Sequence, residues 1–191
     1  MAMGRTNPEA QHDPGGKVKL ALPDGVTGDA HFSACGRYRQ NLTRDWTPAG
    51  DAARSVLFVG MNPSVASAEI SDPTCHRELG FAQSWGLTRY LKGNMLDWRS
   101  TCPREIPHDP ALACSPDNIP ALLDMAQEAE FVVLAYGRLH PRFAGIVDST
   151  LSALEQTGKP LHCLGRNKDG SAKHPLYLAK TTPLQPFSRI S

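Results

Sequence analysis

Four short apolar segments, separated by segments with helical patterns, constrain the fold of this chain most strongly. They are SVLFVG (55–60), YLKGNML (90–96), FVVLAYG (131–137) and LHCLGR (161–166). Each has the length of a buried strand and a near-continuous apolar character. Apolar strands that alternate with helices indicate a parallel sheet that is covered by helices on both faces. The sequence therefore predicts an α/β fold, a three-layer α/β/α sandwich around a mostly parallel four-stranded sheet.

The segments between these strands carry signals for helices. In SDPTCHRELGFAQSWG (71–86), Asp72 stands where an N-cap is expected and Pro73 where the first helical residue is expected. Two further helices are predicted within residues 115–130 and 142–159, where apolar residues recur at helical spacing. Each predicted helix connects two predicted strands, as a parallel sheet requires.

The N-terminal part of the chain differs in composition from the rest. Residues 1–28 are rich in proline and glycine and poor in large apolar side chains, which predicts a flexible tail. Residues 29–191 are then a single domain, long enough to bury a core. The segment 31–46 has short polar and aromatic runs that are typical of a small hairpin.

Charge and cysteine usage limit the classes of partner and compartment. The net charge is +1, so any contact with nucleic acid must rely on local basic clusters. The five cysteines form no C-x-x-C pair, and no segment reaches the roughly 18 consecutive apolar residues of a membrane-spanning helix. Histidines and cysteines lack the spacing of zinc sites, and no glycine-rich phosphate loop is present. We therefore expect a cytoplasmic monomer without a membrane contact, a metal or a cofactor.

Candidate functional residues are those that follow each predicted strand, because ligands of such sheets bind at the carboxyl ends of the strands. These segments are 61–64, 97–101, 136–138 and 166–175. Asn62 is the first candidate, since Pro63 stiffens the backbone directly after it. A carboxamide held at that edge is well placed to orient a water molecule. An Asx-turn that begins a helix is the structural alternative.

Three segments resemble motifs of the uracil-DNA glycosylase superfamily. VLFVGMNPS (56–64) resembles the first motif, in which a strand ends in Gly-hydrophobic-Asn-Pro-Gly. GNMLDWRSTCP (93–103) is similar to the Asn-Met-x-x-Arg-x-Thr segment of the mismatch-specific thymine and uracil glycosylases. KHPLYL (173–178) has the His-Pro start of the second motif, which lies on a loop that enters the minor groove. The chain as a whole also resembles an uncharacterised bacterial and phage family with MNPS and HPLYL motifs.

The resemblance implies a glycosylase-like fold and a monofunctional DNA glycosylase, which hydrolyses the N-glycosidic bond of a flipped base and leaves an abasic site. Asn62 would orient the attacking water, and His174 would donate to the departing base or to a phosphate. The implied substrate-binding residues are Gly60, Met61, Pro63, Ser64, Asn94, Arg99 and Tyr136. The implied DNA-binding residues are Arg166, Lys168, Lys173, Pro175, Leu176 and Tyr177, with Leu176 or Tyr177 as the wedge that replaces the flipped base. Lys180 is a fourth basic residue beside this loop that could contact a phosphate.

The chain departs from the superfamily in both motifs that flank the expected site. After Pro63 it has the small residues 64–67 where the glycosylases have a glycine and a stacking aromatic, and Leu176 replaces the serine that usually follows His-Pro. Small side chains leave room for a substituent on the base. We therefore expect a hypermodified phage pyrimidine, such as glucosylated hydroxymethylcytosine, ahead of uracil or mismatched thymine, and a role in antiviral defence. A nucleoside or nucleotide N-glycosidase and a non-catalytic DNA-binding module are the alternatives.

Overall fold

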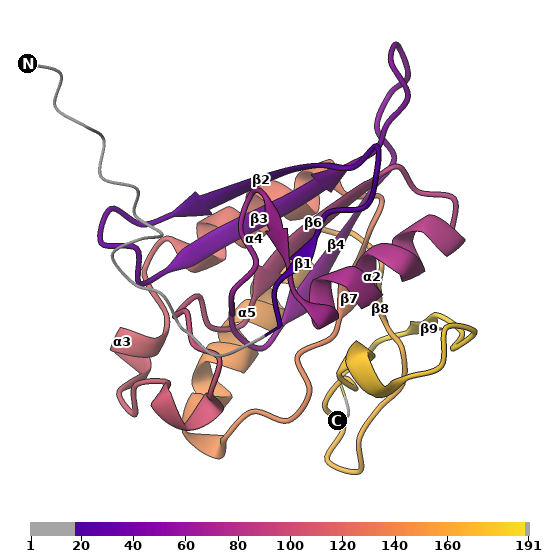
Figure 1. The fold of residues 1–191 in the computed structure, drawn as a ribbon. Helices are drawn as coiled ribbons and strands as arrows, with labels where there is room; N and C mark the ends of the chain where they lie inside the picture. The colour runs from indigo at the N-terminus through magenta and orange to yellow at the C-terminus, as the bar shows by residue number, and fades with distance from the viewer. Residues whose placement is uncertain (1–17, 190–191) are drawn as a thin grey trace, which may run out of the picture.

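A seven-stranded mixed sheet forms the centre of the structure, a computed structural model that describes residues 18–189 (Figure 1). Its strands are β2 (Thr27–Phe32), β3 (Arg39–Asp45), β4 (Ser55–Gly60), β6 (Arg89–Asn94), β7 (Phe131–Leu134), β8 (Leu161–Cys163) and β9 (Gln185–Pro186). They are ordered β2-β3-β6-β4-β7-β8-β9. A separate short pair consists of β1 (Leu20–Ala21) and β5 (Ile70–Ser71).

The four strands predicted from the apolar segments are the four parallel strands of this sheet. Strand β4 pairs in parallel with β6 and β7, and β7 pairs in parallel with β8. The predicted hairpin segment, 31–46, contains β3 and only the last two residues of β2. Strands β2 and β3 extend the sheet antiparallel from β6, and β9 adds an antiparallel strand at the other edge. The sheet is therefore larger than the four strands expected. Apolar runs reveal only strands that are buried on both faces, whereas β2 alternates between exposed and half-buried residues.

The predicted helices are confirmed. The helices are α2 (Pro73–Ser84), α3 (Pro110–Ala113), α4 (Asn118–Glu128) and α5 (Ala144–Gln156), with short 3-10 turns η1 (Pro103–Glu105), η2 (Pro141–Phe143) and η3 (Pro175–Tyr177). The carboxylate of Asp72 accepts a hydrogen bond from the backbone N–H of Cys75 at 2.8 Å, so Asp72 is the N-cap of α2. None of the helices in the described part of the chain is long and apolar enough to cross a membrane.

Helices cover both faces of the sheet (Figure 1). On one face, Phe58 and Tyr90 pack with Phe81 of α2. On the other, Leu57 packs with Leu122 of α4 in a cluster that also contains residues of α5. Because side chains alternate along a strand, every second residue of β6 faces α2. The residues on that side at the carboxyl end of β6 are the ones that reach the site described below.

The predicted tail, residues 1–28, is described only from residue 18 onward. There β1 pairs antiparallel with β5, and β2 begins at Thr27. The boundary expected at residue 28 therefore falls inside a strand of the sheet. Composition did not reveal these strands because backbone pairing, more than burial of large apolar side chains, holds them in place.

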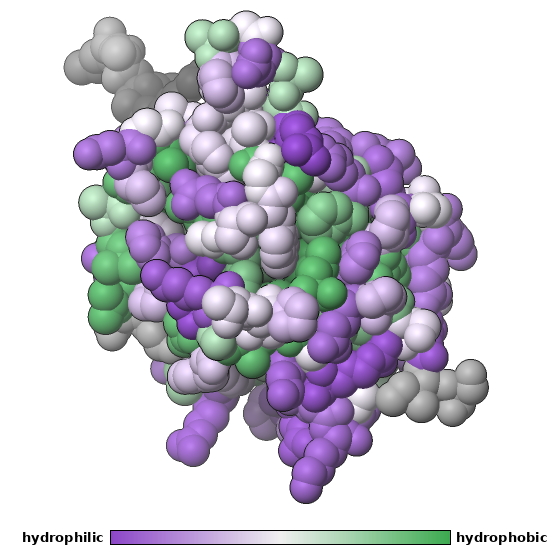
Figure 2. All heavy atoms as spheres, turned by 90° about the vertical axis from the view of Figure 1, so that its right-hand side faces the viewer, coloured by the Kyte–Doolittle hydropathy of each residue, from purple (hydrophilic) through white to green (hydrophobic). Residues whose placement is uncertain are grey.

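The surface on the side of α2 and β9 mixes hydrophobic and hydrophilic side chains (Figure 2). Among the described residues, the large hydrophobic side chains with the greatest exposure are Val18, Leu112 and Tyr177. Tyr177, at 87% exposure, belongs to η3 and lies beside the candidate site.

Candidate functional site

Backbone hydrogen bonds join the two segments that follow β4 and β6. The N–H of Leu96 donates to the carbonyl oxygen of Met61 at 2.9 Å, and the N–H of Ser100 donates to that of Pro63 at 2.9 Å. The two polar motifs therefore lie side by side at the carboxyl edge of adjacent parallel strands, where ligands of such sheets bind.

A cavity of about 320 Å³ opens at this edge. Its walls come from β4, β6 and the segments that follow them, from the start of α2 and from η3. The predicted site residues that line it are Gly60, Met61, Asn62, Ser64, Asn94, His174, Leu176 and Tyr177. Its volume is within the range of small-molecule sites, about 300–1,000 Å³. We call it the Asn62 cavity.

The carboxamide of Asn62 has a defined orientation. Its Nδ2 donates to the carbonyl oxygens of Pro63 at 2.9 Å and Ser100 at 2.8 Å. Because both neighbours are acceptors, the nitrogen must face them, and Oδ1 is the atom that remains to accept a hydrogen bond from a ligand. Asn62 does not begin a helix, since the next helix starts at Pro73. The site thus presents an acceptor that can orient a water molecule.

Asn94 is the second carboxamide of the cavity. It is 1% exposed, and neither its Oδ1 nor its Nδ2 has a hydrogen-bond partner. Its backbone is held by Asn118, whose Nδ2 donates to the Asn94 carbonyl oxygen at 3.0 Å. A buried polar group without a partner costs about 1–3 kcal/mol. Because Asn94 lines the cavity wall, its unpartnered amide is a candidate to form hydrogen bonds with a ligand.

A buried ion pair lies beside Asn94. The Nζ of Lys92 is 2.6 Å from Oε1 of Glu78, and the Oη of Tyr90 donates to Oε2 of Glu78 at 2.5 Å. Burial raises the pKa of Glu78, and the positive charge of Lys92 opposes this shift. Lys92 lines the Asn62 cavity and Glu78 does not, so the ammonium end of this net-neutral pair lies at the cavity wall.

Gly60 leaves the space that Lys92 and Asn94 occupy. A Cβ atom at this position would lie 2.5 Å from Nζ of Lys92 and 2.9 Å from Oδ1 of Asn94. Both distances are shorter than van der Waals contact. A glycine is therefore required at the end of β4, because any larger residue would displace the side chains of Lys92 and Asn94 at the cavity wall.

His174 and Tyr177 reach the cavity from η3. The Nδ1 of His174 accepts a hydrogen bond from the N–H of Leu176 at 3.3 Å, which makes His174 the N-cap of η3. The rings of His174 and Tyr177 have centroids 6.4 Å apart. Pro175, the first residue of η3, is buried and anchors the turn. This turn therefore places an imidazole and an exposed aromatic ring at the cavity.

Arg99 and Tyr136, two predicted substrate-binding residues, lie elsewhere. Arg99 donates from Nη1 to the carbonyl oxygen of Gly36 at 2.8 Å, and its guanidinium carbon is 4.6 Å from the ring centroid of Phe32. It therefore joins the cavity-forming segment to the β2–β3 hairpin. Tyr136 belongs to the core under α4 and α5 and lines a different cavity. Pro63 is buried behind the Asn62 cavity and does not line it.

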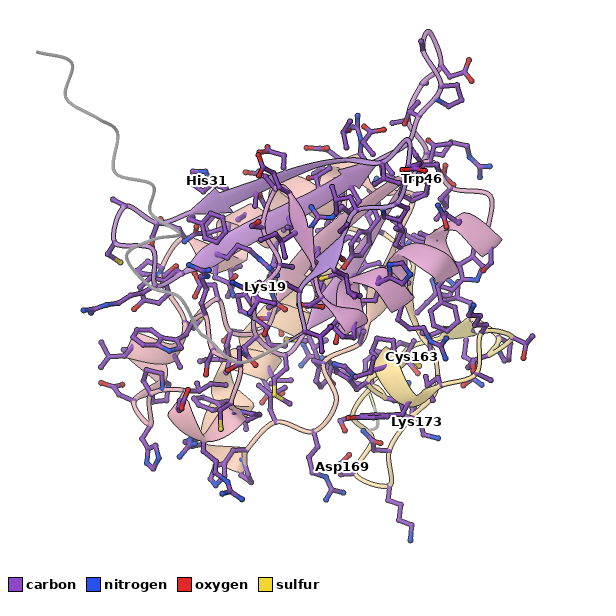
Figure 3. The ribbon with its side chains drawn as sticks, viewed as in Figure 1. Lys19, His31, Trp46, Cys163, Asp169 and Lys173 are labelled. Carbon is purple, nitrogen blue, oxygen red and sulfur yellow. The ribbon has the colours of Figure 1, made fainter. Side chains whose placement is uncertain are left out.

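The basic residues predicted to bind DNA lie on the loop that follows β8. Arg166 packs its guanidinium 4.1 Å from the ring centroid of Phe187 and donates from Nη2 to the carbonyl oxygen of Ser188 at 2.5 Å. Lys168 and Lys173 are exposed, and Figure 3 labels Lys173 on this loop. Arg166 thus holds the C-terminal segment, and the two lysines face solvent.

Cys75 also lines the Asn62 cavity but is not a reactive thiol. Burial raises the pKa of Cys75 to about 12, so it is a neutral thiol at physiological pH. Within residues 18–189 the structure has no group of three or more His, Cys, Asp or Glu side chains that could hold a metal ion.

The sequence analysis missed several residues of the cavity. They are Arg39, Asp72, Pro73, Thr74, Cys75, Lys92 and Pro103, whereas Ser100 and Thr101 belong to the candidate segment 97–101. One of them had a signal: Lys92 stands inside an otherwise apolar strand, and a charge there must find a buried partner. Arg39 had no such signal. It is 1% exposed, donates from Nη1 to the Ala66 carbonyl oxygen at 2.7 Å, and has an Nε without a partner.

These features define an α/β protein with a mixed sheet and a polar cavity at the carboxyl ends of its parallel strands. Residues 37–176 match the family described as "Protein of unknown function (DUF1643)", and the chain belongs to this family. The matched range includes the motifs that supply Asn62, Asn94 and His174 to the cavity. No curated protein and no solved structure matches the chain.

Proposed function

We propose that this protein is a monofunctional DNA glycosylase that removes a flipped pyrimidine and leaves an abasic site. The observation that carries the proposal is the pair of carboxamides in one cavity. Asn62 has its nitrogen bound to two backbone oxygens, which leaves Oδ1 for a water molecule. Asn94 is buried with both amide atoms unpartnered. A donor and an acceptor side by side match the hydrogen-bonding edge of a pyrimidine.

The reaction begins with extrusion of the nucleotide from the base stack, which costs a few kcal/mol. Tyr177 is 87% exposed at the cavity and is the candidate to fill the gap in the stack. The water held by Asn62 then attacks the anomeric carbon, and the electron pair of the broken C–N bond leaves with the base. The proton that the water loses is available to neutralise the base anion.

Stabilisation of the departing base is the main catalytic requirement, because an amide is too weak a base to deprotonate the water. His174 and Lys92 both line the cavity. Lys92 supplies a positive charge that is held in place by Glu78 at 2.6 Å. A fixed charge of this kind acts most strongly on the negative charge that develops on the base in the transition state.

The residues that line the cavity favour a substrate base with a hydroxylated substituent. Tyr177 is the one Phe, Tyr or Trp among the described residues that line it, and it lies on η3. The remaining wall includes the hydroxyl groups of Ser64, Thr74 and Ser100. We therefore propose a hypermodified pyrimidine such as glucosylated hydroxymethylcytosine as the substrate, and defence against phages that carry it as the role.

The test is a base-release assay with the full chain. DNAs that carry uracil, mismatched thymine, hydroxymethylcytosine or glucosylated hydroxymethylcytosine are incubated with the protein and treated with alkali, and the released base is measured by mass spectrometry. We expect alkali-dependent strand breaks with the glucosylated base. Breaks with uracil or thymine alone would keep the class of enzyme and reject the modified base.

Two further results would reject the enzyme class. Base release from free nucleosides or nucleotides, but not from DNA, would identify a small-molecule N-glycosidase. Binding of every DNA without release of any base would identify a non-catalytic DNA-binding module. Each result corresponds to one of the alternatives that the sequence leaves open.

A further inference from the structure

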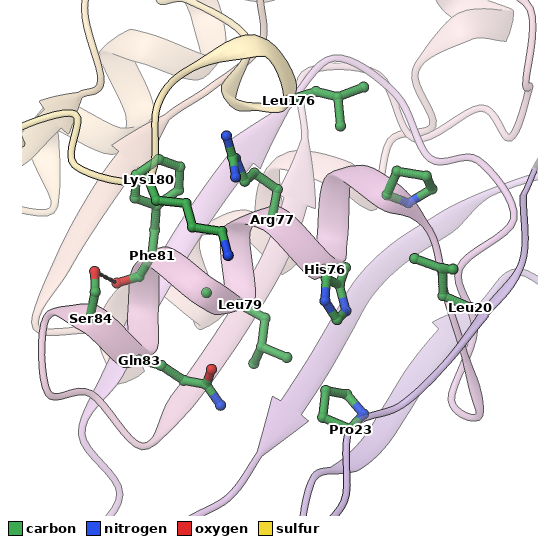
Figure 4. Close-up of a pocket in the computed structure, with 12 residues that line it drawn as sticks. Leu20, Pro23, His76, Arg77, Leu79, Phe81, Gln83, Ser84, Leu176 and Lys180 are labelled. Carbon is green, nitrogen blue, oxygen red and sulfur yellow. Dashed lines mark hydrogen bonds between the residues drawn. The ribbon is translucent and has the colours of Figure 1, made fainter.

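A second cavity, of about 600 Å³, lies against α2 next to the Asn62 cavity (Figure 4). Leu20 and Pro23 form one side of it, and Leu176 and Lys180 form the other. Both cavities are lined by Pro73 and Leu176, so they are neighbours that share a wall. We call this second cavity the α2 groove.

The titratable side chains that line the α2 groove are all basic. They are His76, Arg77 and Lys180, and no Asp or Glu is among the described residues that line it. The whole chain has 20 Lys and Arg against 19 Asp and Glu, so this local excess of basic groups is not a property of the overall composition. His76 and Lys180 are exposed, and Figure 4 shows both side chains at the groove.

Arg77 holds the wall of the groove in place. Its Nη2 donates to the carbonyl oxygen of Leu178, which ties the segment after η3 to α2. Its guanidinium carbon lies 5.8 Å from the ring centroid of Phe81. The groove is therefore joined to η3, the turn that carries His174 and Tyr177.

The remaining lining of the groove is mostly apolar. Leu20, Pro23, Leu79, Phe81 and Leu176 contribute to it, and hydrophobic side chains lie between hydrophilic ones on this side of the molecule (Figure 2). Apolar walls with basic side chains suit a single nucleic-acid strand. Its bases and sugars can pack against the apolar surface, and its phosphates can pair with the basic side chains.

We propose that the α2 groove binds the DNA strand that adjoins the flipped nucleotide, with Lys180 and His76 close to its phosphates. The proposal rests on the proposed function of the Asn62 cavity. A nucleotide in that cavity is covalently linked to its neighbours, so the strand must leave the cavity across one of its walls. The wall at Pro73 and Leu176 leads directly into a groove without acidic lining residues. Of the four basic residues that the sequence indicated as phosphate contacts, Lys180 is the one that lines this groove.

The experiment measures binding of the full chain to a fluorescent single-stranded oligonucleotide with a tetrahydrofuran abasic-site analogue at its centre. Anisotropy titrations at several salt concentrations give the slope of log K against log salt. We expect Lys180→Ala to weaken binding for every sequence and to reduce the slope by about 0.7, the value for one phosphate contact on a single strand. The double variant His76→Ala/Lys180→Ala should bind more weakly than Lys180→Ala alone.

A matched variant controls for the loss of a charge. Arg54→Ala removes an exposed cation just before β4, at the opposite end of that strand from the cavity, where its side chain is 57% exposed. We expect this variant to keep the salt slope of the wild type. All three substituted side chains are exposed, so thermal melting should show an intact fold.

An unchanged salt slope in the His76→Ala/Lys180→Ala double variant would overturn the proposal. A poly-glutamate peptide that displaces the oligonucleotide at equal charge concentration would also overturn it, since the groove would then be a general polyanion surface. Base release separates this proposal from the proposed function. If the wild type releases a base but the double variant binds the oligonucleotide as the wild type does, the DNA-binding role of the α2 groove is rejected and the glycosylase proposal is kept. If the double variant binds the oligonucleotide more weakly but the wild type releases no base, the glycosylase proposal is rejected and the α2 groove is kept as a DNA-binding site.

Discussion

The ammonium group of Lys92 lies 2.6 Å from Oε1 of Glu78, and the two side chains are 4% and 0% exposed. Such a pair contributes little net stability, because desolvation of both charges offsets their attraction. Removal of one partner leaves the other charge buried alone and costs about 3–5 kcal/mol. Lys92 of this pair lies at the wall of the Asn62 cavity, where the proposed reaction uses its positive charge.

A double-mutant cycle tests this interpretation. We expect Lys92→Met to lower the free energy of unfolding by about 3–5 kcal/mol, because Glu78 is left unpaired. The double variant Lys92→Met/Glu78→Gln should recover much of that loss, since Gln still accepts the hydrogen bond from Tyr90. Urea unfolding measures both. Base release should stay low in the stable double variant, and wild-type activity in it would show that the pair has only a structural role.

Gly60→Ala should damage the cavity more than the fold. The added Cβ would lie 2.5 Å from Nζ of Lys92 and 2.9 Å from Oδ1 of Asn94, so both side chains must move. We expect a stability loss of about 1–3 kcal/mol and a larger proportional loss of base release. Gly145→Ala in α5 is the control, because no atom lies within 4 Å of its added Cβ. That variant should keep full activity, and equal activity of the two variants would contradict the role given to Gly60.

Asn62→Ala should abolish base release while DNA affinity is retained, because the Oδ1 that orients the water is lost. The structure adds a stability effect. Two hydrogen bonds from Nδ2 disappear, at a cost of about 0.5–1.5 kcal/mol each. Thermal melting, anisotropy and base release are therefore measured on the same preparation. Persistent base release in a folded Asn62→Ala protein would remove Asn62 from the mechanism.

The parallel strands and helices were predictable because burial leaves a simple pattern in the sequence. The segment Val56–Val59 is wholly buried, and it is continuously apolar. Asp72 and Pro73 mark the start of α2 through local backbone chemistry alone. Strands such as β2 and β9 were not found as readily, because half-exposed edge strands carry no continuous apolar run.

The site was predicted only where its residues follow a strand directly. Asn62 and Asn94 stand at the ends of adjacent parallel strands, so topology brings them together. The partners of buried polar groups depend on which face a helix covers, and one sequence does not contain that information. Glu78 therefore resembled an ordinary charged residue of a surface helix. Arg99 resembled a substrate-binding residue, although its partner is the carbonyl oxygen of Gly36 in the β2–β3 hairpin.

The cysteines should differ strongly in reactivity. Cys35 is exposed, and the hydrogen bond with Ser33 lowers its pKa from 9.0, which increases its thiolate fraction at neutral pH. Burial raises the pKa of Cys75 to about 12, so its thiolate fraction stays negligible up to pH 8 and beyond. Iodoacetamide labelling followed by peptide mass spectrometry should modify Cys35 in the native protein and Cys75 only in denaturant. Equal labelling rates in the native protein would contradict the buried position of Cys75.

Protection against phages should depend on the chemistry of the phage DNA. The cavity has hydroxyl groups and the cations of Arg39 and Lys92 in its walls, which can pair with the hydroxyl groups of a sugar attached to the base. A bacterial host that expresses the protein should therefore reduce the plating of phages with glucosylated hydroxymethylcytosine and leave phages with plain DNA unaffected. The reason is that abasic sites would form only in the invading genome.

Two variants make this plating result specific to base excision. Asn62→Ala should restore plating of the modified phages, because DNA binding without base release leaves their genome intact. Arg54→Ala, which removes an exposed charge outside the cavity, should protect as the wild type does. Immunoblots confirm equal expression of the variants. Equal plating of modified and plain phages, or protection that survives Asn62→Ala, would refute the defence role, and the second result would also show that protection does not require the water-orienting carboxamide.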